Sequence, residues 1–214
     1  MTAPPTTSPG PAAPAFPSIK IVVAGGFGAG KTTLIGSISE IEPLTTEELL
    51  TAAGEPIDSL DGVHGKATTT VSLDHGRRTL TVPAPLMLYL FGTPGQERFR
   101  FLWDDLTRGA VGAVVLADTR RLADSFPSID YFEERSVPFV VAVNQFDGAD
   151  RYSAGQVRQA LELPLRVPVV DCDARDFSST LTVLKTLVRY ALTALTSTPP
   201  APPGLPVDRR AAHP

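Results

Sequence analysis

A glycine-rich turn between an apolar run and a helical pattern constrains this chain more than any other feature. The turn spans residues 25–32 and reads Gly-Gly-Phe-Gly-Ala-Gly-Lys-Thr, a complete G-x-x-x-x-G-K-[ST] pattern. Glycines let backbone N–H groups converge on an anion without obstruction by Cβ atoms, and the helix that follows adds its positive N-terminus. Because a strand precedes the turn and a helix follows it, the pattern predicts a loop that binds a nucleoside triphosphate or diphosphate.

Individual residues of this loop have predicted roles. Lys31 supplies a positive charge for the β- and γ-phosphates, and we also expect it to be catalytic. The hydroxyl of Thr32 is placed to ligate Mg²⁺. The other predicted phosphate-binding residues are Gly26, Gly28, Ala29, Gly30 and Thr33.

Apolar runs alternate with helical patterns along the rest of the chain. The runs predict strands at residues 19–24, 86–91, 111–117, 139–143 and 167–170, with a further strand or bent pair at 71–82. Apolar spacing of i, i+3 and i+4 predicts helices around residues 122–132, 157–161 and 181–195. The alternation predicts an α/β fold of three layers, α/β/α, in which about six mostly parallel strands are flanked by about five helices. Ligands of such sheets bind in the loops at the carboxyl ends of the strands.

Proline marks both ends of the predicted domain. Residues 1–17 contain six prolines and no charged side chain, and residues 197–214 contain six more prolines. Both segments lack the periodic apolar residues that offset ordering entropy, so we predict two disordered tails around one domain of residues 18–196. An SH3-type ligand is the less favoured reading of such a tail.

Composition excludes several classes of protein. The 19 Lys and Arg against 23 Asp and Glu give a net charge of -4, which argues against a general nucleic-acid binder. A single cysteine, Cys172, excludes an intrachain disulfide and a cysteine-cluster zinc site. The uncharged stretch at residues 79–96 carries three prolines, so it cannot form one membrane-spanning helix, and the chain begins without a secretory pattern. We therefore expect a soluble, cytoplasmic protein with no direct membrane insertion.

Three further segments follow the phosphate loop in a fixed order, and together they resemble motifs of the Ras-like small GTPases. Residues 91–99 (Phe-Gly-Thr-Pro-Gly-Gln-Glu-Arg-Phe) are similar to D-T-A-G-Q-E-R-F, residues 144–147 (Asn-Gln-Phe-Asp) to N-K-x-D, and residues 173–175 (Asp-Ala-Arg) to S-A-K. The resemblance spans residues 19–196 and is strongest to the bacterial MglA-type GTPases, above all to those of actinobacterial conservon operons. It implies a P-loop NTPase fold of the small-GTPase type that binds GTP or GDP with Mg²⁺.

The resemblance assigns base recognition to two loops. The carboxylate of Asp147 can accept hydrogen bonds from N1–H and the 2-amino group of guanine, and adenine offers neither donor. Asn144 would tie the base loop to the phosphate loop, and the stem of Gln145, which replaces the family's lysine, would cover the base. The second loop consists of Asp173, Ala174 and Arg175, which are all expected to bind the nucleotide. The N–H of Ala174 would face the guanine O6.

The resemblance also implies two switch segments. Gly95 would donate its N–H to the γ-phosphate, and Gln96 would orient the attacking water. The first switch lies between residues 42 and 70 and shows weak helical spacing at residues 44–50. Its threonine for Mg²⁺ and the γ-phosphate is Thr70, with Thr69 and Thr68 as alternatives. Each of these residues also has a purely structural interpretation. Gln96 could be a polar residue at the start of a surface helix, and the threonines could belong to an edge strand.

Two residues depart from the family pattern. Gly92 stands where an aspartate usually supports Mg²⁺, so we expect weaker metal binding through Thr32, the switch threonine and water. Phe27 adds bulk to the phosphate loop and would crowd the catalytic glutamine and an incoming arginine. No arginine matches a family position for that role; the nearby candidates are Arg77, Arg78 and Arg98. His64 and His75 are expected to be surface residues.

Three functions are open at this point. The leading hypothesis is a GTP-dependent switch with slow hydrolysis, and the alternative is a nucleotide-bound scaffold with negligible turnover. An ATPase of the partitioning type is disfavoured because it predicts no guanine-selecting carboxylate such as Asp147. The resemblance further implies a roadblock-fold protein and a sensor-kinase-like membrane complex as partners, through which the protein could associate with a membrane.

Overall fold

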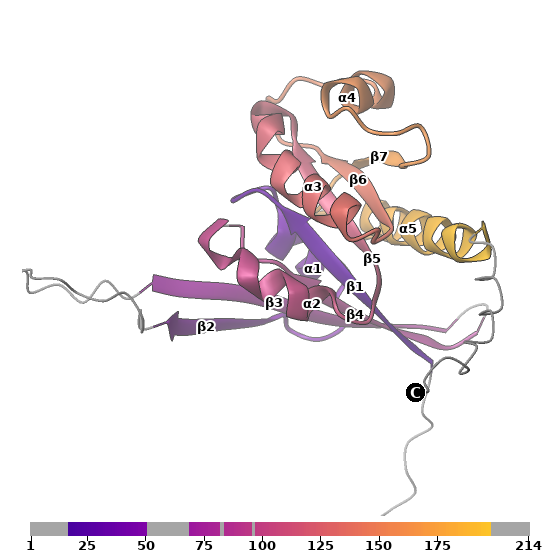
Figure 1. Cartoon of the computed structure of the whole chain (residues 1–214). Helices are drawn as coiled ribbons and strands as arrows, with labels where there is room; N and C mark the ends of the chain where they lie inside the picture. Colours follow the sequence, from indigo (N-terminus) through magenta and orange to yellow (C-terminus); the bar gives the residue numbers. More distant parts are fainter. Residues whose placement is uncertain (1–16, 51–68, 82–83, 96, 198–214) are drawn as a thin grey trace, which may run out of the picture.

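The computed structural model describes residues 17–50, 69–81, 84–95 and 97–197, which form a seven-stranded sheet between two layers of helices (Figure 1). In sheet order the strands are β2 (Leu44–Leu50), β3 (Thr69–Leu80), β4 (Leu86–Gly92), β1 (Ser18–Gly25), β5 (Ala110–Asp118), β6 (Phe139–Asn144) and β7 (Val169–Cys172). The five strands from β4 to β7 are parallel, whereas β3 pairs antiparallel with both β2 and β4. The predicted mostly parallel α/β fold is confirmed, with seven strands in place of about six.

Helices cover both faces of this sheet. They are α1 (Lys31–Ile38), α2 (Trp103–Thr107), α3 (Phe126–Glu134), α4 (Ala154–Ala160) and α5 (Phe177–Ser197), with 3₁₀ segments at η1 (Glu97–Leu102) and η2 (Thr119–Ser125). Helices α1 and α5 contribute to the core on one face, and α2, α3 and α4 contribute to the core on the other. Among the described elements, no helix is long and apolar enough to cross a membrane.

The central strands are buried because helices lie on both sides of them. Val22 and Val23, adjacent in β1, point to opposite faces and are both fully buried. Each such side chain contributes about 1.5–3 kcal/mol of hydrophobic stabilisation. Phe99 and Trp103 from the segment after β4 are also buried and pack inward. This core fixes the ends of β1, β4, β5, β6 and β7, where the loops that carry the motifs begin.

Three local predictions were wrong or incomplete. Residues 44–50 form strand β2 rather than a helix, because their backbone pairs with residues 69–75 of β3 and this pairing overrides weak local spacing. The helix predicted around 122–132 is divided into η2 and α3, with non-helical dihedral angles at Arg121. His75 is not a surface residue: it is half-buried, its ring centroid lies 4.7 Å from that of Phe91, and burial lowers its pKa.

Several predictions fall outside the described residues. The structure does not describe residues 1–16, 51–68 and 198–214. Both predicted tails, most of the first switch and His64 therefore stay predictions. Helix α5 continues to Ser197, one residue into the segment predicted as the C-terminal tail. The limits of the domain at residues 18 and 196 therefore stay a proposal.

Candidate nucleotide-binding site

The phosphate loop lies between β1 and α1 at the carboxyl edge of the sheet, where the parallel strands end. Gly30 has a φ of 105°, in the left-handed region that favours glycine, and a Cβ atom there would lie 2.5 Å from Nδ2 of Asn144. A side chain at this position would therefore both strain the backbone and push the two loops apart. The loop borders a cavity of about 270 Å³ that is lined by Phe27, Gly28, Gly30, Lys31, Thr32, Thr33, Asp74, Thr93 and Gly95.

Lys31 is the buried cation of this site. Lys31 is only 9% exposed, and its Nζ donates to the carbonyl oxygens of Gly25 at 2.9 Å and Gly26 at 2.8 Å. Burial lowers the pKa of Lys31 to about 8, and the negative charge of Asp74 opposes that shift. The ammonium group is thus held within the loop, where a phosphate would offer it a far stronger acceptor than a neutral carbonyl.

Asn144 joins the phosphate loop to the second predicted base loop. Its Nδ2 donates to the carbonyl oxygen of Ala29 at 2.9 Å, and its Oδ1 accepts from the N–H of Ala174 at 3.0 Å. Both contacts are buried, so they fix the relative position of loops from β1, β6 and β7. The N–H of Ala174 is therefore used inside the protein, and the structure does not present it to a base as the resemblance implied.

Asp147 lies at the outer end of the same arrangement. Its side chain is 87% exposed and is paired with Arg175, whose Nη1 lies 3.1 Å from Oδ2. Arg175 also donates to Asp173, which holds the pKa of the Asp173 carboxyl below its usual range. Asp147 is thus not a buried carboxylate, and a base would have to cover it and share it with Arg175. Gln145 and Phe146 are half-buried beside it.

The predicted switch residues are only partly described. Gly95 lies over the phosphate loop: a Cβ atom there would be 2.9 Å from Nζ of Lys31. Gln96, the predicted catalytic glutamine, lies outside the described residues. The backbone of Thr70 is in β3, four residues from Asp74, and four strand residues span roughly 13 Å. The side chain of Thr70 lies outside the described part of the chain, so its predicted role at the metal stays a prediction.

Asp74 contacts the hydroxyl of Thr32, and the sequence analysis missed it. Its Oδ2 accepts from the Thr32 hydroxyl at 2.6 Å, and the residue is 5% exposed. Thr93, also in the cavity wall, is 2% exposed, and its hydroxyl has no hydrogen-bond partner among the described residues. Hydroxyl and carboxylate oxygens are the ligands that Mg²⁺ prefers, so the groups of this cavity fit that ion. No signal within one motif could have identified Asp74, because it lies in β3, next to the strand β4 that leads into the motif at residues 91–99.

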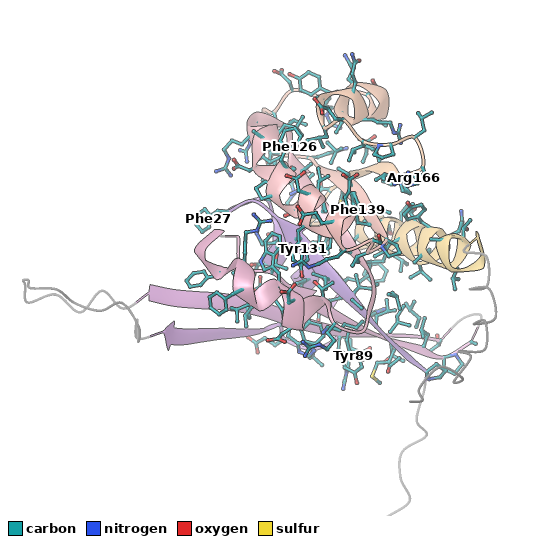
Figure 2. All side chains as sticks on the ribbon, viewed as in Figure 1. Phe27, Tyr89, Phe126, Tyr131, Phe139 and Arg166 are labelled. Atoms are coloured by element: carbon teal, nitrogen blue, oxygen red, sulfur yellow. The ribbon has the colours of Figure 1, made fainter. Side chains whose placement is uncertain are left out.

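The arginine nearest the phosphate loop was also missed. Nη2 of Arg121, in η2, donates to the carbonyl oxygen of Phe27 at 2.8 Å. The predicted candidates lie elsewhere: Arg77 pairs with Glu40, and Arg78 stacks over the ring of Phe177. The side chain of Arg98 is outside the described part of the chain. Phe27 itself is 68% exposed and its ring points away from the sheet (Figure 2).

The fold and this site define a class of protein: a nucleotide-binding P-loop protein of the Ras-like type. The profile of a family described as "conserved hypothetical ATP binding protein" matches residues 23–194, and the chain belongs to that family. Human Ras-related protein Rab-7b is 26% identical over 184 residues, which cover 81% of this chain and 82% of the relative.

Two archaeal proteins are also similar. A probable translation initiation factor IF-2 of Thermofilum pendens is 34% identical over 134 residues, or 59% of this chain. The chain spans about a fifth of that factor, since the match covers 21% of its length. The uncharacterized protein MJ1339 of Methanocaldococcus jannaschii is 28% identical over 134 residues, which cover 62% of this chain and 73% of the relative.

Proposed function

We propose that this protein is a GTP-binding molecular switch that hydrolyses GTP slowly to GDP and phosphate. The observation that carries the proposal is the double contact of Asn144 with Ala29 and Ala174, which holds the phosphate loop and the base loops in one rigid unit. A ligand that spans this unit has phosphates at Lys31 and a base at Asp147. A nucleotide with two or three phosphates has that form.

Asp147 supports guanine as the base. Its two carboxylate oxygens can accept from N1–H and the 2-amino group of guanine together, whereas adenine would leave them facing no donor. The family description names ATP, so the choice of base is the point at which this proposal departs from it. Arg175, which contacts both Asp147 and Asp173, would keep the carboxylate oriented toward the base.

The phosphate groups would be bound by Lys31 and by the backbone N–H groups of the loop. Mg²⁺, held through the hydroxyl of Thr32, would neutralise charge on the β- and γ-phosphate oxygens. Gly95 would contact the γ-phosphate only in the triphosphate state, and Gln96 would orient the attacking water. Loss of the γ-phosphate would release this segment and change the surface that a partner meets.

The resemblance to MglA-type and conservon GTPases supports a proposal for the partners. These are a roadblock-fold protein and a sensor-kinase-like membrane complex, which would recruit an otherwise cytoplasmic protein. The working unit would be residues 18–196. The second candidate function, a nucleotide-bound scaffold with negligible turnover, would follow if the side chain of Phe27, in the phosphate loop beside Gly95, obstructed the catalytic glutamine.

Single-turnover hydrolysis distinguishes the switch from the scaffold. The purified protein, loaded with GTP and Mg²⁺, should release phosphate at about 10⁻⁴–10⁻³ per second, the range of a small GTPase without an arginine finger. Gln96→Leu should lower that rate about tenfold and leave GTP affinity nearly unchanged, because the glutamine acts mainly in the transition state. Gln159→Leu, on the exposed face of α4, is the matched control. A wild-type rate no faster than that of GTP in buffer would favour the scaffold.

A further inference from the structure

The carboxylate of Asp74 in strand β3 lies beside Gly92 of the adjacent strand β4. Asp74 and Gly92 stand opposite each other, because the antiparallel register pairs His75 with Phe91, and each lies one residue further along. Opposite residues of an antiparallel pair point to the same face of the sheet. A Cβ atom on Gly92 would lie 3.1 Å from the Cβ of Asp74 and 3.2 Å from its Oδ2. Gly92 therefore makes room for the side chain of Asp74.

The hydrogen bond between Asp74 and Thr32 has the direction that a metal ligand needs. The Thr32 hydroxyl donates its proton to Oδ2 of Asp74 at 2.6 Å, which leaves the lone pairs of the hydroxyl oxygen for a cation. A charged acceptor behind a ligand fixes its orientation and makes it more basic. The same carboxylate adds a negative charge within a cavity that otherwise carries the buried ammonium of Lys31.

We propose that Asp74 is the positioning residue for Mg²⁺ in this protein, acting through Thr32 in place of the aspartate that Gly92 removes. Neighbouring strands are about 4.8 Å apart. A carboxylate from β3 can therefore reach the same cavity as a carboxylate from the adjacent strand β4 would. The consequence is that Gly92 does not weaken the metal site; it is the residue that allows Asp74 to enter it. This inference rests on the proposed binding of a guanine nucleotide with Mg²⁺.

The test is the Mg²⁺ dependence of GDP release, measured with a fluorescent GDP on the full chain. In the wild type, Mg²⁺ should slow release, and chelation should speed it up. Asp74→Ala should raise the Mg²⁺ concentration for half-maximal slowing by about 10–100-fold, the usual effect of removing a residue that orients a metal ligand. Asp74→Asn keeps the shape and loses the charge, so it should shift the same midpoint in the same direction even if the alanine variant folds poorly.

Moving the carboxylate back across the strand pair is the sharpest arm of the experiment. The double variant Asp74→Ala/Gly92→Asp should recover most of the wild-type Mg²⁺ midpoint. Gly92→Asp alone should destabilise the protein, because it places two carboxylates side by side in a buried site. Asp171→Ala, which removes an exposed carboxylate from β7, is the matched control and should leave the midpoint unchanged.

Three results would overturn the inference. One is a wild-type Mg²⁺ midpoint in both Asp74 variants. Another is weaker GDP binding by the same factor with and without Mg²⁺, which would limit Asp74 to holding the loop. Wild-type release that ignores Mg²⁺ would also contradict it. Failure of the wild type to bind any guanine nucleotide would instead contradict the proposed function, so the two failures are distinguishable.

Discussion

Lys31→Ala should abolish binding of GTP and GDP at micromolar concentrations. The Lys31 ammonium is buried, and truncating one partner of a buried, hydrogen-bonded charge pair costs about 2–5 kcal/mol, or roughly 30-fold to more than 1000-fold in affinity. Two neutral carbonyl oxygens, those of Gly25 and Gly26, would lose their donor as well, so the loop itself would loosen. Isothermal titration with GDP measures the loss directly.

The matched control for this variant is Lys185→Ala. Lys185 is exposed on α5, so its removal takes away one positive charge without touching the cavity. It should bind GDP like the wild type, and both variants should keep a cooperative thermal transition. Tight GDP binding by a folded Lys31→Ala protein would mean that the nucleotide does not sit in this loop.

Asp147→Asn should exchange guanine for xanthine as the preferred base. The amide can donate to the 2-oxo group of xanthine where the carboxylate accepted from the 2-amino group of guanine. A site built to hydrogen-bond a polar group of its ligand can discriminate against an analogue that lacks this group by a factor of about 10⁴–10⁵. Asp147, however, is 87% exposed and is shared with Arg175. We therefore expect a change in the xanthine-to-guanine affinity ratio of about 100-fold, smaller than at a fully buried site.

Competition of GDP and xanthosine diphosphate for a fluorescent nucleotide measures this ratio. Asp130→Asn, an equivalent change on the exposed side of α3, should leave it at the wild-type value. Because the variant should gain xanthine binding, its outcome does not depend on a loss that misfolding could mimic. An unchanged ratio in Asp147→Asn would remove Asp147 from base recognition.

Local sequence patterns predicted the parts of this protein that depend on neighbouring residues. The phosphate loop needs a strand, glycines and a helix in direct succession, so the pattern at residues 25–32 was sufficient to locate it. The buried strands were equally clear, because parallel strands covered on both faces are continuous apolar runs. The helix α5 was also predicted locally, from the apolar spacing of its own residues.

Features made by contacts between distant segments could not be read in this way. Asp74 acts across a strand pair whose register is set by the sheet, so its position in the chain gave no indication that it faces Gly92. Strand β2 forms by pairing with β3, although its own residues have a helical spacing. Arg121 reaches Phe27 because the chain leaves helical geometry at Arg121 itself, and spacing rules assume a regular helix.

The choice between guanine and adenine is the central claim, and one measurement tests it most directly. A fluorescent GDP bound to the wild-type protein in Mg²⁺ is titrated with GTP and, separately, with ATP. GTP should displace it at micromolar or lower concentration, whereas ATP should leave it bound at concentrations about 100-fold higher, because adenine offers Asp147 no donor. Displacement by ATP at the same concentration as GTP would contradict the account and return the protein to the ATP-binding role that its family description names.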